Sequence, residues 1–119
     1  MKRMCFALGA VLLAGNAFAA DPDILDVSVE KVGTVWNVRV TVAHPDIGWD
    51  HYADGWEVLD ASGNRLGYRK LLHPHVDEQP FTRSLSGIVI PDGTREIFVK
   101  ARCSVDGWSD TAMRVALLP

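Results

Sequence analysis

The sequence predicts an all-β protein, a sandwich of two antiparallel sheets with seven strands, because three observations agree. Apolar and polar residues alternate with a period of two along most of the chain after residue 20. Turn-forming residues such as Gly, Asn, Asp and Pro separate these stretches at short intervals. No stretch carries apolar residues at helical spacing for three turns. Seven short strands with turns between them are typical of a two-sheet sandwich.

Each expected strand has its own pattern. In the first, Leu25, Val27 and Val29 alternate with polar residues, and the run from Trp36 to Val42 repeats this alternation after a turn at 33–34. The turns at 60–64 and 91–94 contain the residue types that adopt positive φ or fix the backbone. The seven strands are expected at residues 25–30, 36–42, 55–59, 66–72, 81–90, 97–103 and about 112–118.

One segment resembles a known family. The run 84–109, SLSGIVIPDGTREIFVKARCSVDGWS, is similar to the E–F–G region of fibronectin type III domains, where a Gly-x-x-Pro-Gly-Thr turn leads into an alternating strand and a Gly-x-Ser hairpin. Trp36 resembles the core tryptophan of that family. The chain departs from the pattern in two places, since Asp92 lies inside the Pro-Gly turn and Ile97 replaces a tyrosine. The resemblance implies an immunoglobulin/fibronectin type III-like β-sandwich and no particular chemistry.

The N-terminus has the features of a secretory signal. A basic start at Lys2 and Arg3 precedes an uncharged apolar run at 4–13, and Ala17-Phe18-Ala19 resembles a cleavage site. The run is shorter than the roughly 20 residues of a membrane span. We therefore expect a signal peptide at 1–19, one domain at 20–119 and no membrane span after cleavage. The expected location is the bacterial periplasm or the secreted fraction.

Cleavage changes the charge and the cysteine count. Removing Lys2 and Arg3 leaves 10 of the 12 basic residues against all 15 acidic ones, so the net charge falls from −3 to −5. Nucleic acid is then not expected as a partner, because phosphate binding needs a basic surface. Cys103 becomes the single cysteine, which excludes an intrachain disulfide. Its alternation with Val99 and Ala101 predicts a small core residue, and the alternative is a thiolate ligand near the histidine-rich loops.

The expected topology gathers the polar loops at one end. Strands that alternate in direction place the loops 44–54, 73–80 and 105–110 together. These loops contain all four histidines and seven acidic residues, whereas the opposite end contains ordinary turns. Imidazole and carboxylate groups are common ligands of zinc and copper(II).

The sequence thus predicts a divalent transition-metal site, for zinc or copper(II), at this end. His73 and His75 lie two residues apart, so an extended segment points both to one side. His51 would complete the ligands, and His44, at a strand end, is the weaker candidate. The carboxylates expected to close the site or orient these histidines are Asp50, Asp54 and Glu78. The alternative is that the same residues cap turns in solvent.

A different function is suggested by the aromatic residues of the loops. Trp49, Tyr52 and Trp108 could form a binding surface for an envelope protein, or the indoles could cover the end of the sandwich as lids. The chain would then be a non-catalytic interaction or structural module. No nucleophile motif or cofactor motif is present, so we expect no enzyme activity except through a metal-bound water.

Overall fold

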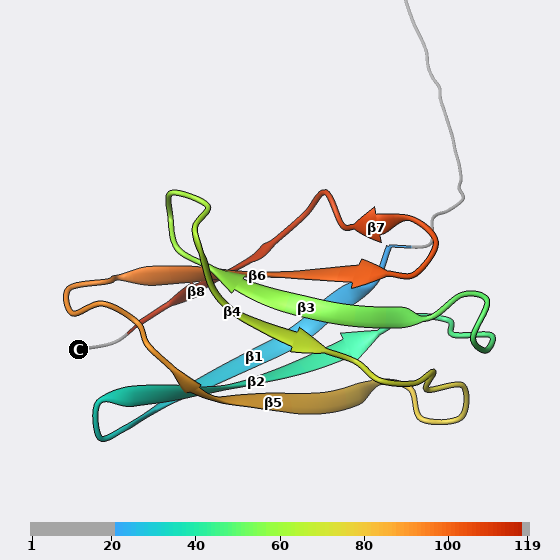
Figure 1. Ribbon diagram of the computed structural model, residues 1–119, viewed down its shortest axis with the longest axis horizontal. Coiled ribbons are helices and arrows are strands. Elements are labelled where there is room, and N and C mark those ends of the chain that lie inside the picture. Colours follow the sequence, from blue (N-terminus) through green and yellow to red (C-terminus); the bar gives the residue numbers. More distant parts are fainter. Residues whose placement is uncertain (1–20, 118–119) are drawn as a thin grey trace, which may run out of the picture.

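Eight strands form two antiparallel sheets that pack against each other in the computed structural model, which describes residues 21–117 (Figure 1). The first sheet has the order β1-β2-β5, and the second has the order β4-β3-β6, with β7 and β8 both pairing with β6. The strands are β1 (Asp23–Val32), β2 (Val35–Ala43), β3 (Ala53–Leu59), β4 (Arg65–Lys70), β5 (Phe81–Ile88), β6 (Glu96–Cys103), β7 (Gly107–Trp108) and β8 (Met113–Ala116).

The all-β sandwich is confirmed, but the structure has eight strands where the sequence predicts seven. The additional strand is β7, whose two residues pair with Arg102 and Cys103 at the end of β6. Gly107 adopts a φ of 77°, which lets the chain reverse immediately and return along β6. The predicted signal peptide at 1–19 lies outside the described residues. Among residues 21–117, no helix is long and apolar enough to cross a membrane.

The core follows from the alternation in the strands. The inward residues of β2 and β6 are fully buried, and their outward neighbours are more exposed. Trp56 of β3 is also fully buried and is the largest side chain among them. Trp36, which resembles the core tryptophan of fibronectin type III domains, is instead half-buried near the end of the first sheet. The central tryptophan of this sandwich is therefore Trp56.

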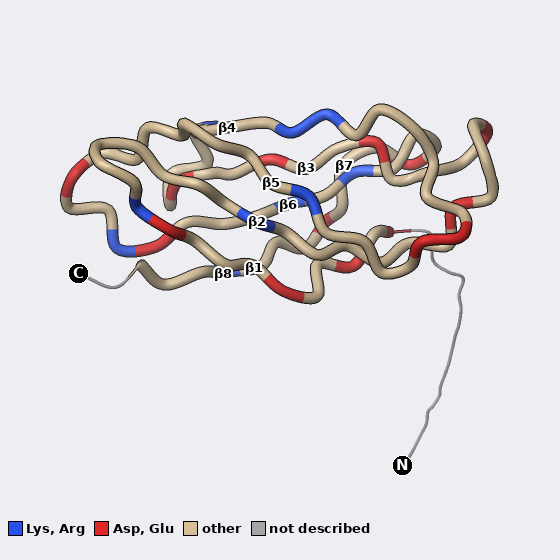
Figure 2. Tube along the Cα trace, turned by 90° about the horizontal axis from the view of Figure 1, so that it is seen from below, with Lys and Arg blue, Asp and Glu red and all other residues tan. Residues whose placement is uncertain are grey.

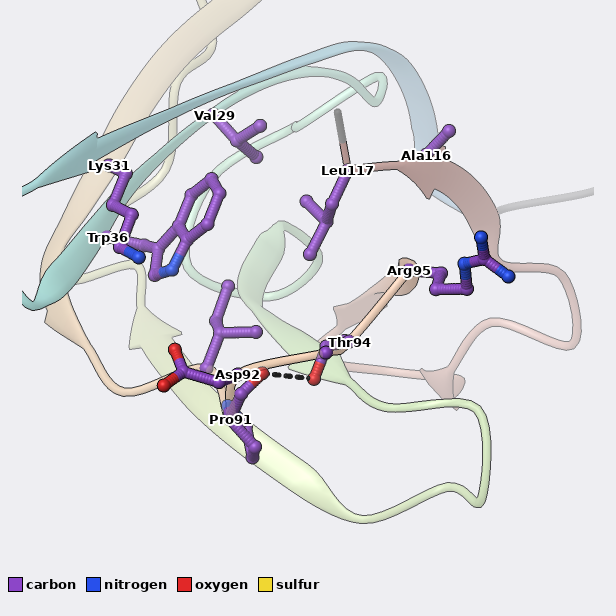
Figure 3. Close-up of a pocket in the computed structure, with 11 residues that line it drawn as sticks. Val29, Lys31, Trp36, Pro91, Asp92, Thr94, Arg95, Ala116 and Leu117 are labelled. Atoms are coloured by element: carbon purple, nitrogen blue, oxygen red, sulfur yellow. Dashed lines mark hydrogen bonds between the residues drawn. The ribbon is translucent and has the colours of Figure 1, made fainter. Parts of the chain in front are cut away.

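The two ends of the sandwich differ in construction. At one end, tight turns join β1 to β2 and β3 to β4, and a pocket of about 760 Å³ opens near the segment from Ile90 to Arg95. Figure 3 shows Val29, Trp36 and Leu117 facing into this pocket, while the Arg95 side chain points away from them. At the other end, longer loops connect β2 to β3, β4 to β5, and β6 to β8 (Figure 1). We call these the turn end and the loop end.

Candidate functional site

The loop end brings together a histidine–histidine–cysteine cluster. His44 directly follows β2, His51 lies just before β3, and Cys103 is the last residue of β6. One ligand atom from each of the three residues lies within 4.8 Å of the others. Since β2 belongs to one sheet and β6 to the other, the cluster spans the space between the two sheets. We call it the His-His-Cys cluster.

One distance in the cluster matches the spacing of two ligands on one metal ion. His51 Nε2 lies 3.5 Å from Cys103 Sγ, and the rings of His44 and His51 meet edge to face with centroids 4.8 Å apart. A tetrahedral ion bound at about 2.0–2.1 Å to nitrogen and about 2.3 Å to sulfur separates those two ligand atoms by about 3.5 Å. The observed spacing between His51 and Cys103 therefore fits a bound ion, and it equally fits a hydrogen bond between the two side chains.

Asp46 fixes the ring of His44. The Nδ1 atom of His44 lies 2.6 Å from Asp46 Oδ1, and both side chains are fully buried. Because a carboxylate can only accept a hydrogen bond, the Nδ1 nitrogen donates to Asp46, and Nε2 is the ring nitrogen that remains for other groups. His44 Nε2 is buried and has no hydrogen-bond partner among the described residues. A carboxylate that holds one imidazole nitrogen and leaves the other free is the usual arrangement behind a metal-bound histidine.

The same carboxylate organises the surrounding loops. Asp46 Oδ1 also accepts from the backbone N–H of Ala53 at the start of β3, at 2.9 Å. Its Oδ2 atom accepts from the backbone N–H of His75 at 2.8 Å. Gln79 adds a second link, since it accepts from the His44 N–H and donates to the His75 carbonyl. The β2–β3 and β4–β5 loops are therefore held together by buried hydrogen bonds.

Cys103 is buried, as its alternation predicts, but its thiol also has polar contacts. The backbone N–H of Asp106 donates to Sγ at 3.3 Å, and Asp106 Oδ2 lies 3.6 Å from Sγ. Burial raises the pKa of the Cys103 thiol, and the N–H of Asp106 partly opposes this change. Because a metal binds the thiolate, binding must displace the thiol proton. Asp106 is thus a nearby carboxylate that the sequence had not suggested.

Of the six predicted ligands, only His51 belongs to the His-His-Cys cluster. His73 is exposed, and its Nδ1 atom lies 3.2 Å from the carbonyl oxygen of Pro74. The ring of His75 stacks on Phe81, and its Nε2 atom accepts from the Arg83 guanidinium at 3.0 Å. The rings of His73 and His75 lie together, with centroids 4.8 Å apart, on the β4–β5 loop.

The predicted carboxylates have different surroundings. Asp54 pairs with Arg102 at 2.8 Å, and Glu78 pairs with Arg83 at 3.0 Å. The hydrogen bond from Arg83 also lowers the pKa of Glu78. Asp50 is exposed and forms no ion pair with any residue in the described range.

The predicted aromatic surface is divided between two places. Trp49 is 67% exposed and meets Tyr52 edge to face at the loop end, with centroids 5.6 Å apart. Trp108 is half-buried beside Tyr68, and the guanidinium groups of Arg65 and Arg102 lie over its ring. Trp49 and Tyr52 therefore form an accessible pair, whereas Trp108 packs against side chains of the second sheet.

Comparisons with known proteins give one relative and one similar structure. No family model matches the chain. A protein of Halomicrobium mukohataei named "Putative lipoprotein" is 38% identical over 96 residues, which cover 80% of this chain and 47% of that protein. The chain thus spans about half the length of the relative it matches.

The similar structure is a crystal structure of superoxide reductase in the oxidized state. The two have a TM-score of 0.53 and 14% sequence identity, and the match covers 86% of this chain and 93% of the other. At this identity the likeness shows the fold alone, and it supports the β-sandwich derived from the strands.

Proposed function

We propose that this chain is a metal-binding β-sandwich protein whose first ligands are His44, His51 and Cys103. The observation that carries the proposal is the buried Nε2 atom of His44, which has no hydrogen-bond partner although Asp46 holds the other ring nitrogen. Leaving such a nitrogen unpaired costs about 1–3 kcal/mol, which a metal bond would offset. Two imidazoles and a thiolate suit zinc and copper among the transition metals.

The proposal names a ligand set different from the one the sequence predicts, and substitution of single ligands can tell the two sets apart. Both contain His51, but one continues with His44 and Cys103, and the other with His73, His75 and the carboxylates of Asp50, Asp54 and Glu78. Arg83 donates to both His75 and Glu78, and its positive charge opposes a cation there. The position of Arg83 therefore favours the His-His-Cys cluster as the metal site.

Zinc and copper(II) titrations of the metal-free protein by calorimetry test the proposal. We expect one ion per chain, with binding lost in His44→Gln and in Cys103→Ser. The matched controls are His73→Gln and Glu78→Gln, which should bind as the parent does. Circular dichroism establishes that each variant is folded. Loss of binding in the control variants, with His44→Gln and Cys103→Ser unaffected, would instead support the ligand set predicted from the sequence.

We also propose that the protein is exported to the cell envelope or beyond, with cleavage after Ala19 and a fibronectin type III-like domain from residue 20 onward. The N-terminal sequence and the name of the relative from Halomicrobium mukohataei support export. Mass spectrometry of the protein isolated from cell fractions tests this proposal. A mature N-terminus at Ala20 in the envelope or secreted fraction is expected, and an uncleaved protein in the cytoplasm would contradict it.

A further inference from the structure

Apolar side chains are exposed around the His-His-Cys cluster. They come from three loops that are far apart in sequence and meet at the loop end (Figure 1). A soluble protein exposes single apolar residues without consequence, but a group that lies together marks an interaction site. The loop-end patch comprises Ile47 (72% exposed), Trp49 (67%), Leu72 (67%), Val76 (52%) and Val105 (60%).

Part of the patch adjoins the proposed metal site. The backbone N–H of Ile47 donates to the carbonyl of His51 at 3.1 Å, so this part of the patch is attached directly to a proposed ligand. Val105 lies between Cys103 and Asp106, whose N–H donates to the sulfur. His44 and Cys103 are buried and His51 is only half-buried. A partner that covers the patch would therefore approach the site from the side of His51.

The charges at the loop end are mainly acidic, and the guanidinium groups of Arg83 and Arg102 there are paired with Glu78 and Asp54. No Lys or Arg occurs in the four loop-end segments 44–52, 71–80, 104–106 and 109–112. Four aspartates in them are exposed and form no ion pair with any residue from 21 to 117, namely Asp50, Asp77, Asp106 and Asp110. Figure 2 shows several acidic positions in these loops, besides others elsewhere on the chain, while basic positions lie along the strands and near the other end. The apolar patch thus has an acidic border.

We propose that the loop-end patch docks a protein whose apolar contact surface is bordered by Lys and Arg side chains. Burial of the apolar side chains, with Trp49 as the principal aromatic anchor, would supply affinity, and the opposite charges would favour this partner. A second copy of this chain does not fit, because two acidic borders would then face each other. The further claim, that this partner delivers a metal ion to the His-His-Cys cluster or receives one from it, rests on the proposed function.

Two synthetic peptides test the surface. They share one apolar core containing Trp and Leu, and they carry either Lys or Glu residues on both sides. Binding to the protein expressed from the full sequence is measured by fluorescence anisotropy, and NMR shift changes locate the contact. We expect the Lys peptide to bind at the loop-end patch and to weaken as salt increases, and the Glu peptide to bind more than about tenfold less tightly.

The matched variants replace exposed apolar residues at each end. Trp49→Ser/Val105→Ser should weaken binding of the Lys peptide by more than about tenfold. Val32→Ser/Val89→Ser, at exposed positions of the turn end, should leave binding unchanged. Equal binding of the two peptides, unchanged binding in the loop-end variant, or NMR shifts centred on Trp36 would overturn the proposal. So would a dimer, detected by sedimentation, that dissociates in the Trp49→Ser/Val105→Ser variant.

Metal titration separates this inference from the proposed function. If Cys103→Ser loses metal but still binds the Lys peptide at the patch, both claims stand. If the parent protein binds the peptide but no metal, the docking surface stands and its role in metal exchange fails. If the parent binds metal but not the peptide, the docking surface fails and the metal site stands.

Discussion

The loop end and the turn end of this sandwich use the same strands but serve different purposes. At the turn end, short connections leave few polar groups to satisfy, and the half-buried Asp60 caps one turn by accepting from the N–H groups of Ser62 and Asn64. At the loop end, longer connections bury Asp46, His44 and His75. Burying polar groups costs free energy unless each finds a partner. His44 Nε2 and His75 Nδ1 both lack a partner among the described residues, and His44 is the one of the two that belongs to the His-His-Cys cluster.

The largest expected difference in stability between the two ends comes from replacing Asp46 at the loop end and Asp60 at the turn end. Asp46→Ala removes the acceptor of three buried donors and should lower the free energy of unfolding by about 3 kcal/mol or more. Asp60→Ala should lower the free energy of unfolding clearly less, because solvent replaces the lost acceptor. Urea denaturation of both variants measures the difference. Equal losses of stability would show that the buried network of the loop end is no more important than a surface turn.

The turn end should contribute to stability without affecting the metal site. Trp36 packs against the core and lines the turn-end pocket. Trp36→Ala should lower the free energy of unfolding by about 2 kcal/mol, less than for a fully buried tryptophan. Zinc affinity, measured by calorimetry, should stay the same. A large loss of zinc affinity in this variant would mean that the two ends are not independent.

The pH dependence of stability should show a smaller effect, which comes from His75 at the loop end. Burial, with a further contribution from the charge of Arg83, lowers the pKa of His75. The neutral ring is then favoured in the folded state, so its contribution to stability is full above the unfolded pKa of about 6.5 and is lost as the pH falls from that value through the lower folded pKa. The urea midpoint of the metal-free protein should decrease from pH 7.5 to pH 5.5, with a smaller decrease in His75→Gln. Identical profiles for the two proteins would contradict this assignment.

The fold could be predicted from the sequence because alternation reports directly on a buried strand face. Val38, Val40 and Val42 are apolar at every second position and all lie in the core. The two-residue β7 could not be predicted in this way, since two residues are too short to show a period. Its formation depends on the positive φ of Gly107 and on the edge of β6.

The candidate site was only partly predictable. The sequence correctly indicates that the histidine-bearing loops share one end, but the spacing of His73 and His75 does not reveal which histidines lie close to Cys103. His44 and Cys103 each lie at the loop end of a buried alternating strand, β2 and β6. Residues at such positions face the space between the sheets, and this signal could have identified them. The role of Asp46 depends on three contacts from separate segments, which spacing does not reveal.

Cobalt(II) titration with ultraviolet and visible spectroscopy tests the central claim most directly. A cobalt–thiolate bond gives a charge-transfer band in the near ultraviolet, so the spectrum reports whether Cys103 binds the ion. We predict that this band appears with one equivalent of cobalt(II), disappears in Cys103→Ser and in His44→Gln, and persists in His73→Gln. A cobalt(II) complex without a thiolate band, or one abolished by His73→Gln and unaffected by Cys103→Ser, would contradict the His-His-Cys cluster as the metal site.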